Sequence, residues 1–442
     1  MLERYKPYTA KTIRETPYWD RLTPKLQEAM AVVSKVMPFR TNEYVLGLIN
    51  WDAIPDDPIF RMTFPHPDML LEHEYSALKQ VLDEGNEAAT RRQVEAIWRR
   101  MNPHPAGQLT HNSATLDGRT LPGIQHKYRE TVLFFPSAGQ TCHAYCTFCF
   151  RWAQFIGEED LKFNARESQD LVDYLRVHPQ VTDVLITGGD PLIMTSRSLA
   201  GYLLPLLGPG LGHIKNIRIG TKSVAYWPQR FVSDKDTEEL LELFRTVVAA
   251  GINLSIMGHY NHPVELSTVV AKSAVKRIIA TGATLRMQAP VIRHINEDPR
   301  DWAALWTEGV RLGAIPYYMF VERDTGPSHY FALPLAQAFT IFQAAYRTVS
   351  GLSRTVRGPS MSTFYGKVVI NGIETIAGEK VFVLQLLQAR DPEWVLKPFF
   401  AKFDSQATWF DELVPAFGAS QFFFQDPPTT TAQLIPLIMA NG

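Results

Sequence analysis

Residues 142–149 read Cys-His-Ala-Tyr-Cys-Thr-Phe-Cys and contain all three cysteines of the 442-residue chain. Cysteines that serve as small apolar core residues would be scattered, and three thiols this close together cannot staple a large fold. Thiolates gathered on a short loop are what a soft metal ion or an iron–sulfur cluster requires. Three ligands also leave a fourth coordination position open, as in catalytic sites. The stretch therefore predicts a catalytic metal or iron–sulfur site at Cys142, Cys146 and Cys149.

The spacing Cys-x3-Cys-x2-Cys, with Phe148 before the last cysteine, resembles the motif of radical S-adenosylmethionine enzymes. The resemblance implies that the three thiolates hold a [4Fe–4S] cluster whose remaining iron chelates S-adenosylmethionine. Reduction of that cluster would release a 5′-deoxyadenosyl radical, so the cofactor performs the chemistry and the protein directs it. On the same resemblance, Phe148 is expected to contact S-adenosylmethionine.

The overall composition is that of an ordinary globular protein. Hydrophobic residues make up 45% of the chain, and 44 Lys and Arg balance 45 Asp and Glu. A nucleic-acid-binding protein would show a basic excess, and a membrane span would need about 18 or more uninterrupted apolar residues. The N-terminal residues lack the apolar run of a secretory signal. We therefore expect a cytoplasmic protein that binds neither nucleic acid nor membrane.

Six short apolar runs, rich in β-branched or aromatic residues, alternate with amphipathic stretches of helix length and predict a parallel α/β fold. Gly251, Gly282 and Gly313 each follow a helical pattern, and they lie 31 residues apart (282 − 251 and 313 − 282), the length of one strand–helix unit. Right-handed crossovers favour a partial (β/α)6 TIM-type barrel, with an open doubly wound sheet as the alternative. The predicted strands are Thr131–Pro136, Asp183–Gly189, Ile214–Thr221, Ile252–His259, Thr284–Val291 and Ile315–Val321.

The barrel is expected to occupy residues 126–350. Residues 1–125 form a helical, loop-rich N-terminal extension, with helical patterns at Pro24–Val36 and Leu71–Arg100, and its expected role is packing. Residues 103–130 are polar and rich in Pro and Gly, so we expect a long connection there. Residues 351–442 form a small C-terminal extension to which no pattern beyond residue 375 assigns a role.

Polar residues follow the predicted strands at their C-terminal ends, where chemistry gathers in parallel α/β folds. Gly188, Gly189 and Asp190 end the second strand, and such glycines let a ligand approach the backbone closely. This element resembles the one with which the superfamily contacts the amino group of S-adenosylmethionine. The resemblance also implies contacts from His259 and Gln288, with a plain solvated loop as the alternative for each residue.

Ordered matches from about residue 39 to 375 resemble one branch of the superfamily, the lysine 2,3-aminomutase family. The resemblance implies that pyridoxal phosphate is a further cofactor and that an amino group migrates from the α to the β carbon. By motif position, Arg151 would bind the substrate carboxylate, Lys127 the phosphate of pyridoxal phosphate, and Asp324 a distal substrate amine. An ion-pairing role near the cluster is the alternative for Arg151. The matching segments are residues 123–128, the cysteine loop 142–149 with Arg151, and residues 186–192, 218–220, 228–230, 259–266 and 316–318.

The chain departs from the family where the lysine that carries pyridoxal phosphate is expected. The family places that lysine after a glycine-rich run preceded by aspartate, whereas residues 356–367 are longer and bulkier here. Lys367 follows a glycine and is the candidate, with an ordinary surface lysine as the alternative. Arg357 stands where the family has a second acidic residue for the lysine amine, so we expect an acidic or neutral amino acid, or another carboxylate, as substrate. No cysteine follows Cys149, so any homo-oligomer lacks the family's zinc site.

Three functions remain open from the sequence. The first is a pyridoxal phosphate-dependent aminomutase acting on an amino acid other than lysine. The second is a radical enzyme without pyridoxal phosphate, such as an epimerase or a dehydrogenase. The third, from another class, is a non-catalytic iron–sulfur redox sensor. Both enzyme hypotheses imply a small-molecule substrate and an electron donor such as flavodoxin or ferredoxin.

Overall fold

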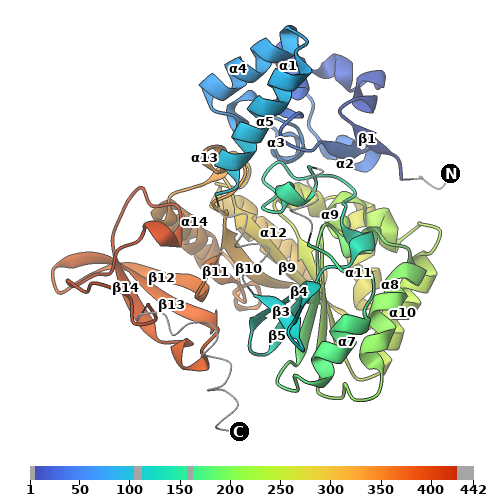
Figure 1. Cartoon of the computed structure of the whole chain (residues 1–442), viewed down its shortest axis with the longest axis vertical. Coiled ribbons are helices and arrows are strands. Elements are labelled where there is room, and N and C mark those ends of the chain that lie inside the picture. Colours follow the sequence, from blue (N-terminus) through green and yellow to red (C-terminus); the bar gives the residue numbers. More distant parts are fainter. Residues whose placement is uncertain (1–4, 104–111, 157–162, 426–442) are drawn as a thin grey trace.

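A computed structural model describes residues 5–103, 112–156 and 163–425 of the chain (Figure 1). The residues before 104 form a mostly helical layer at the top of Figure 1. Its α1 begins at the N-cap Thr23, whose side chain accepts from the amide of Leu26, and has Pro24 in its first turn. Both helical patterns predicted here are confirmed. The elements are β1 (Pro7–Thr9), α1 (Pro24–Val33), β2 (Arg40–Asn42), α2 (Glu43–Leu48), α3 (Pro58–Thr63), α4 (Glu72–Asp83) and α5 (Glu87–Met101).

A single sheet of twelve strands runs in the order β14 to β3, so that every strand lies beside its neighbours in sequence. Strands β5 to β11 pair in parallel, and antiparallel strands extend the sheet on both sides. The six predicted strands are confirmed as β5 to β10. The strands are β3 (Ser113–Leu116), β4 (Arg119–Tyr128), β5 (Thr131–Phe134), β6 (Asp183–Ile186), β7 (Asn216–Thr221), β8 (Asn253–His259), β9 (Thr284–Val291), β10 (Ile315–Val321), β11 (Arg357–Ser362), β12 (Gly366–Ile376), β13 (Glu379–Ala389) and β14 (Pro398–Lys402).

Helices follow the parallel strands, as predicted. Gly251, Gly282 and Gly313 all have positive φ, at +84°, +88° and +93°, which confirms that they end helices. A doubly wound sheet would reverse its strand order at a switch point. The sequential order seen here contradicts that alternative. The helices are α7 (Gln169–Arg176), α8 (Ser196–Leu203), α9 (Ser223–Tyr226), α10 (Thr237–Ala249), α11 (Val269–Ile279), α12 (Pro299–Arg311), α13 (Ser328–Phe331) and α14 (Leu335–Thr348).

One expectation about the flanking segments was wrong, and one feature there was not predicted. Residues 103–130, predicted as a connection, contain the hairpin of β3 and β4, and the sheet also continues beyond β10 through four further strands. The C-terminal strands β12 to β14 enclose a second apolar core that includes Phe399, Phe410, Phe422 and Phe424. The aromatic cluster near residue 422 is therefore packing for this meander.

The sheet curves so that its two ends face each other across an interior. Among the described strands β3 and β14 do not pair, so the barrel is not closed by hydrogen bonds. Instead, the Arg390 side chain after β13 donates to Asn112 before β3, with 2.6 Å between Nη2 and Oδ1. Alternation on β9 turns Leu285 and Met287 into the core and leaves Arg286 and Gln288 on the opposite face. No helix in the described ranges is long and apolar enough to cross a membrane.

Candidate active site

The cysteine loop follows β5, at the end of the sheet where parallel strands terminate. The three thiols are partly buried, and burial together with the charge of Cys146 raises the pKa of Cys149 to about 12. Burial, Asp190 and the other two cysteines likewise raise the pKa of Cys142. Over the residues that the structure describes, no three His, Cys, Asp or Glu side chains converge on a single metal ion. The chemistry of the donor set fits a [4Fe–4S] cluster, because thiolates are the ligands that its irons take and this loop supplies three of them.

Phe148, between the last two cysteines, is buried rather than exposed in the loop. Its ring packs edge-on against Phe331, with 6.0 Å between the ring centroids. Phe148 therefore anchors the loop to α13, and its predicted contact with S-adenosylmethionine stays a prediction.

The N-terminal layer holds the cysteine loop through hydrogen bonds, which goes beyond the packing role expected of it. The buried Asn42 side chain donates to the carbonyls of His143 and Tyr226, with 3.1 Å for each bond. The Thr147 amide donates to the carbonyl of Met62 over 2.9 Å. One amide side chain thus ties the loop to α9.

Asn42→Leu is expected to loosen this loop, because the Tyr226 carbonyl would lose the Asn42 donor and the His143 carbonyl would keep only the Tyr5 hydroxyl. We expect the free energy of unfolding to fall by roughly 2 kcal/mol and the iron bound per chain to fall with it. Denaturant titration and iron assay measure both quantities. Asn371→Leu, at an exposed position on β12, is the matched control, and wild-type iron content in Asn42→Leu would contradict the prediction.

Gly188 and Gly189 pack against the stem of the cysteine loop. A Cβ on Gly188 would lie 2.2 Å from Nε2 of Gln140, and one on Gly189 would lie 2.5 Å from the amide nitrogen of Thr141. Both positions therefore need glycine for the loop to cross the end of β6. A ligand contact at these glycines is not needed to explain them.

Asp190 is 2% exposed, and protein groups surround its carboxylate. It accepts from the Leu192 amide at 3.0 Å, the Thr221 hydroxyl at 2.7 Å, and the amides of Lys222 and Ser223 at 2.8 and 2.9 Å. These bonds use the acceptor positions of the carboxylate. Asp190 therefore joins the end of β6 to the start of α9, and its predicted contact with S-adenosylmethionine stays a prediction.

His259 and Gln288 lie together at the ends of β8 and β9, as the sequence predicts. Their side-chain Nε2 atoms are 2.9 Å apart. Burial, and then the nearby Lys222 ammonium, lowers the pKa of His259 to about 3. The imidazole is therefore neutral near pH 7 and can accept a hydrogen bond from the Gln288 amide.

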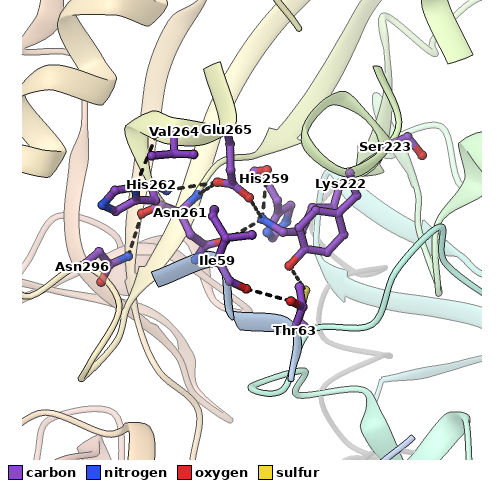
Figure 2. A network of polar contacts seen from close by, with 12 residues as sticks. Ile59, Thr63, Lys222, Ser223, His259, Asn261, His262, Val264, Glu265 and Asn296 are labelled. Carbon is purple, nitrogen blue, oxygen red and sulfur yellow. Dashed lines mark hydrogen bonds and ion pairs between the residues drawn. The ribbon is translucent and has the colours of Figure 1, made fainter. Parts of the chain in front are cut away.

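A buried ion pair lies next to His259 (Figure 2). Lys222 Nζ is 2.7 Å from Oε1 of the fully buried Glu265 and 2.8 Å from Oδ1 of Asn261. The same ammonium lies 4.6 Å from the centre of the Tyr226 ring, and the Tyr226 hydroxyl is 3.4 Å from Sγ of Cys146. Glu265, Lys222 and Tyr226 thus form a continuous polar support for one cysteine.

Two buried donors beside this network have no protein partner among the described residues. They are Nδ2 of Asn261 and the hydroxyl of Tyr260. Buried polar groups are normally satisfied, so both are open to a polar ligand. The sequence singles out the segment 259–266 as a candidate site. Lys222, which contacts Glu265 and Asn261 of that segment, is too distant in sequence to be recognised as their partner.

Arg151 has free donors beside the cysteines. Its Nε and Nη2 atoms are buried without a partner, and its guanidinium stacks 4.4 Å from the ring centre of Phe135. Burial lowers the pKa of Arg151 to about 10, although Cys149 and Cys142 oppose the shift. No ion pair explains Arg151 among the described residues, so the ion-pairing alternative loses support and the arginine is open to an anion.

Lys127 on β4 and Lys367 on β12 meet in the interior from opposite ends of the sheet. Burial, followed by the charges of Lys127, Arg218 and Arg357, holds the pKa of Lys367 well below its usual range. Burial and two further arginines lower the pKa of Lys127 to about 7. The Lys367 ammonium nitrogen lies 4.0 Å from the ring centre of Tyr318. Lys367 is therefore not an ordinary surface lysine.

The sequence predicts that Asp324 binds a distal substrate amine, and the neighbouring Arg323 also acts on the interior. The charge of Arg323 lowers the pKa of Lys127, and its Nε is buried without a partner. Asp324 is partly buried and is not among the groups that shift the pKa of either lysine. A role for Asp324 in binding an amine therefore stays a prediction.

Several interior residues were missed from the sequence. Arg218 and Arg286 stand at the alternate, less buried positions of otherwise apolar strands. A charged residue at such a position could have been recognised in the sequence as a candidate for the interior site. Arg218 pairs with Asp183, with 2.8 Å between Nε and Oδ1, whereas Arg286 has no carboxylate partner in the described ranges. Tyr318 carried no signal of its own.

Comparison with known proteins gives a relative over nearly the whole chain. "Putative L-lysine 2,3-aminomutase" of Aquifex aeolicus (strain VF5) is 32% identical over 413 residues, which cover 93% of this chain and 97% of the relative. The L-lysine 2,3-aminomutases of Clostridium subterminale and Haemophilus influenzae are 25% and 27% identical, over 77% and 57% of this chain and 70% and 71% of their own. No family model matches the sequence.

A solved structure, that of Streptococcus suis SuiB bound to S-adenosylmethionine, superposes on 62% of this chain and 61% of its own, with 13% identity and a TM-score of 0.35. A superposition this loose carries no argument. The relationship rests on the long sequence match, which includes the cysteine loop and the lysine segment. The chain therefore belongs to the L-lysine 2,3-aminomutase family of radical S-adenosylmethionine enzymes.

Proposed function

We propose that this radical enzyme also uses pyridoxal phosphate, bound by Lys367, to move an amino group on an amino acid other than lysine. The observation that carries the proposal is the buried Lys367 beside Lys127, Arg218 and Arg357. Its depressed pKa favours the neutral amine, which is the form that attacks an aldehyde. The surrounding positive charges suit a phosphate.

The residues fit pyridoxal phosphate in charge and in burial. Lys367 would hold its aldehyde carbon, and Lys127 and Arg218 would stand near its phosphate. When bound, pyridoxal phosphate supplies the unsaturated nitrogen link through which an amino group can pass between adjacent carbons. Tyr318, under the Lys367 ammonium, limits the freedom of the side chain.

The cysteine loop fits the radical-generating group. Cys142, Cys146 and Cys149 would hold the [4Fe–4S] cluster, and His259 and Gln288 would line the site of S-adenosylmethionine. When bound, the cluster and S-adenosylmethionine supply the 5′-deoxyadenosyl radical. Arg151 would orient the substrate carboxylate with its two free donors.

The curved sheet would act as a partial (β/α)6 barrel around this chemistry. We assign the barrel to residues 126–350, with extensions before and after it. Its interior would exclude water from the radical, and an external reductant such as flavodoxin or ferredoxin would reduce the cluster.

Titration of the purified enzyme with pyridoxal phosphate tests the proposal. We expect one equivalent to bind per chain and to give a visible absorbance band that Lys367→Ala lacks. Lys402→Ala, an exposed lysine on β14, is the matched control and should bind as wild type does. Equal binding by wild type and Lys367→Ala would refute the assignment of Lys367.

A second candidate is a radical enzyme that does not use pyridoxal phosphate. It is favoured by the regular pairing of the segment before Lys367, where β11 joins β10 in parallel and β12 antiparallel in place of an open glycine-rich loop. The same titration decides, because this candidate predicts no band in either protein. Membership of an enzyme family removes the non-catalytic redox sensor.

Lys127→Met is expected to stabilise the cofactor-free protein while weakening pyridoxal phosphate binding. The folded-state pKa of Lys127, about 7, lies below that of the unfolded chain, so the unfolded state binds the proton more readily. As the pH falls toward 7, the free energy of unfolding of wild type should fall relative to that of the variant. Below pH 7 the difference between the two proteins should stay constant. Thermal melts across this range measure the effect, and a variant that melts below wild type at every pH would contradict it.

A further inference from the structure

The interior contains an alternating series of cations and aromatic rings that the proposed chemistry leaves partly unused. The Arg286 guanidinium lies 5.0 Å from the ring centre of Tyr317. Arg357 lies 4.5 Å from the rings of both Tyr317 and Tyr318, and Lys367 follows at 4.0 Å from Tyr318. These five residues, here called the cation ladder, come from β9, β10, β11 and β12.

No carboxylate pairs with Arg286 or Arg357 anywhere in the described part of the chain. Both side chains are only partly exposed, and a single Tyr317 ring separates two like charges. Ring faces stabilise a cation by only about 0.5–2 kcal/mol, and two guanidinium groups near the same ring repel each other. An anion that binds between them would offset this repulsion.

The groups already assigned do not supply that anion. In the proposed function, the phosphate lies with Lys127 and Arg218, and the substrate α-carboxylate lies with Arg151. Glu322 is buried near the interior. Burial raises its pKa well above its usual range, although the charge of Arg323 opposes this shift, and the raised pKa favours the neutral carboxylic acid. The Arg286 and Arg357 end of the ladder therefore remains without a counter-charge.

We propose that the substrate is an amino acid whose side chain ends in a second carboxylate, bound by Arg357 and Arg286 at the end of the cation ladder. This inference rests on the proposed function for the reacting amino group, and it adds the substrate class. Because Arg357 and Lys367 contact the same Tyr318 ring, a carboxylate held by Arg357 would lie close to the Lys367 amine, where the aldehyde carbon of pyridoxal phosphate would be held. A distal ammonium, as in lysine, would meet two positive charges there.

Isothermal titration calorimetry of the anaerobically reconstituted enzyme, with and without pyridoxal phosphate, tests this substrate class. The probes are L-glutamate, L-aspartate, L-glutamine and L-lysine. We expect one of the two dicarboxylates to bind at least about tenfold more tightly than glutamine, as a charge-assisted hydrogen bond predicts, and lysine to bind most weakly. Equal binding of glutamate, aspartate and glutamine, tighter binding of lysine, or no binding of any probe would overturn the inference.

Arg357→Gln and Arg286→Gln should each remove the preference over glutamine, and circular dichroism checks that both variants fold. Arg354→Gln, at an exposed neighbouring position, should keep the preference. The two proposals fail separately. Dicarboxylate selectivity without the pyridoxal phosphate band would refute only the proposed cofactor, whereas the band without selectivity would refute only the substrate class.

Discussion

Cys149→Ser is expected to leave the purified protein with less than about a tenth of the wild-type cluster iron, since metal binding needs the full ligand set. The chain has no fourth cysteine that could replace the lost thiolate. Without the cluster the enzyme cannot reduce S-adenosylmethionine, so 5′-deoxyadenosine formation should fall to background. Iron and sulfide assays, the spectrum of the reduced cluster and chromatography of the products measure the three effects.

Phe150→Leu is the control for this result, because Phe150 is exposed and lies next to Cys149 without being a candidate ligand. It should keep its iron. Cys142→Ser and Cys146→Ser should behave as Cys149→Ser does. A serine variant that retains the reduced-cluster spectrum and cleaves S-adenosylmethionine would contradict the assignment of that cysteine.

Lys367→Ala is expected to lower amino-group migration by at least about a thousandfold, as loss of a covalent catalytic residue does. The cluster lies on a separate loop, so reductive cleavage of S-adenosylmethionine should continue. Parallel assays of rearranged amino acid and of 5′-deoxyadenosine separate these two outcomes. Loss of both activities together would indicate a folding defect.

Lys367→Arg provides the conservative comparison, because it keeps a long basic side chain over Tyr318 but cannot attack an aldehyde at ordinary pH. It should be as inactive as Lys367→Ala in amino migration. Migration at the wild-type rate in Lys367→Arg would contradict a covalent role for this lysine.

The parallel part of the fold was predictable because local pattern and tertiary structure agree there. The runs 284–291 and 315–321 are rich in β-branched, aromatic or apolar residues, and β9 and β10 have these same bounds. The cysteine loop, His259 and Gln288 were found because the loop follows such a run and the other two residues lie within one. Strand ends meet at one edge of a parallel sheet, so sequence order was enough to bring them together.

Two of the flanking strands, β11 and β4, were missed because their sequences resemble loops. Strand β11 reads Arg-Gly-Pro-Ser-Met-Ser, with no β-branched residue, and β4 contains both Pro122 and Gly123. Both are strands because each has partners on two sides, so tertiary pairing overrides their weak propensity. Curvature of the sheet is equally invisible in sequence, and it is what brings Lys127 to Lys367.

The unpredicted site residues depend on contacts between distant segments. Asn42 supports a loop about a hundred residues later in the chain, at 3.1 Å from the His143 carbonyl. Arg323 and Asp324 are adjacent in sequence, and only the backbone direction after β10 decides which one acts on Lys127. The proposed role of Arg286 becomes visible only together with Arg357, because both guanidinium groups lie near the ring of Tyr317.

Reductive trapping of pyridoxal phosphate tests the central proposal most directly. The reconstituted enzyme would be incubated with pyridoxal phosphate, treated with borohydride and digested, and the modified peptide would be sequenced by mass spectrometry. We predict a stable phosphopyridoxyl group on Lys367 in most chains and on no exposed lysine to a comparable extent. Modification confined to exposed lysines, or absent altogether, would contradict the assignment of Lys367.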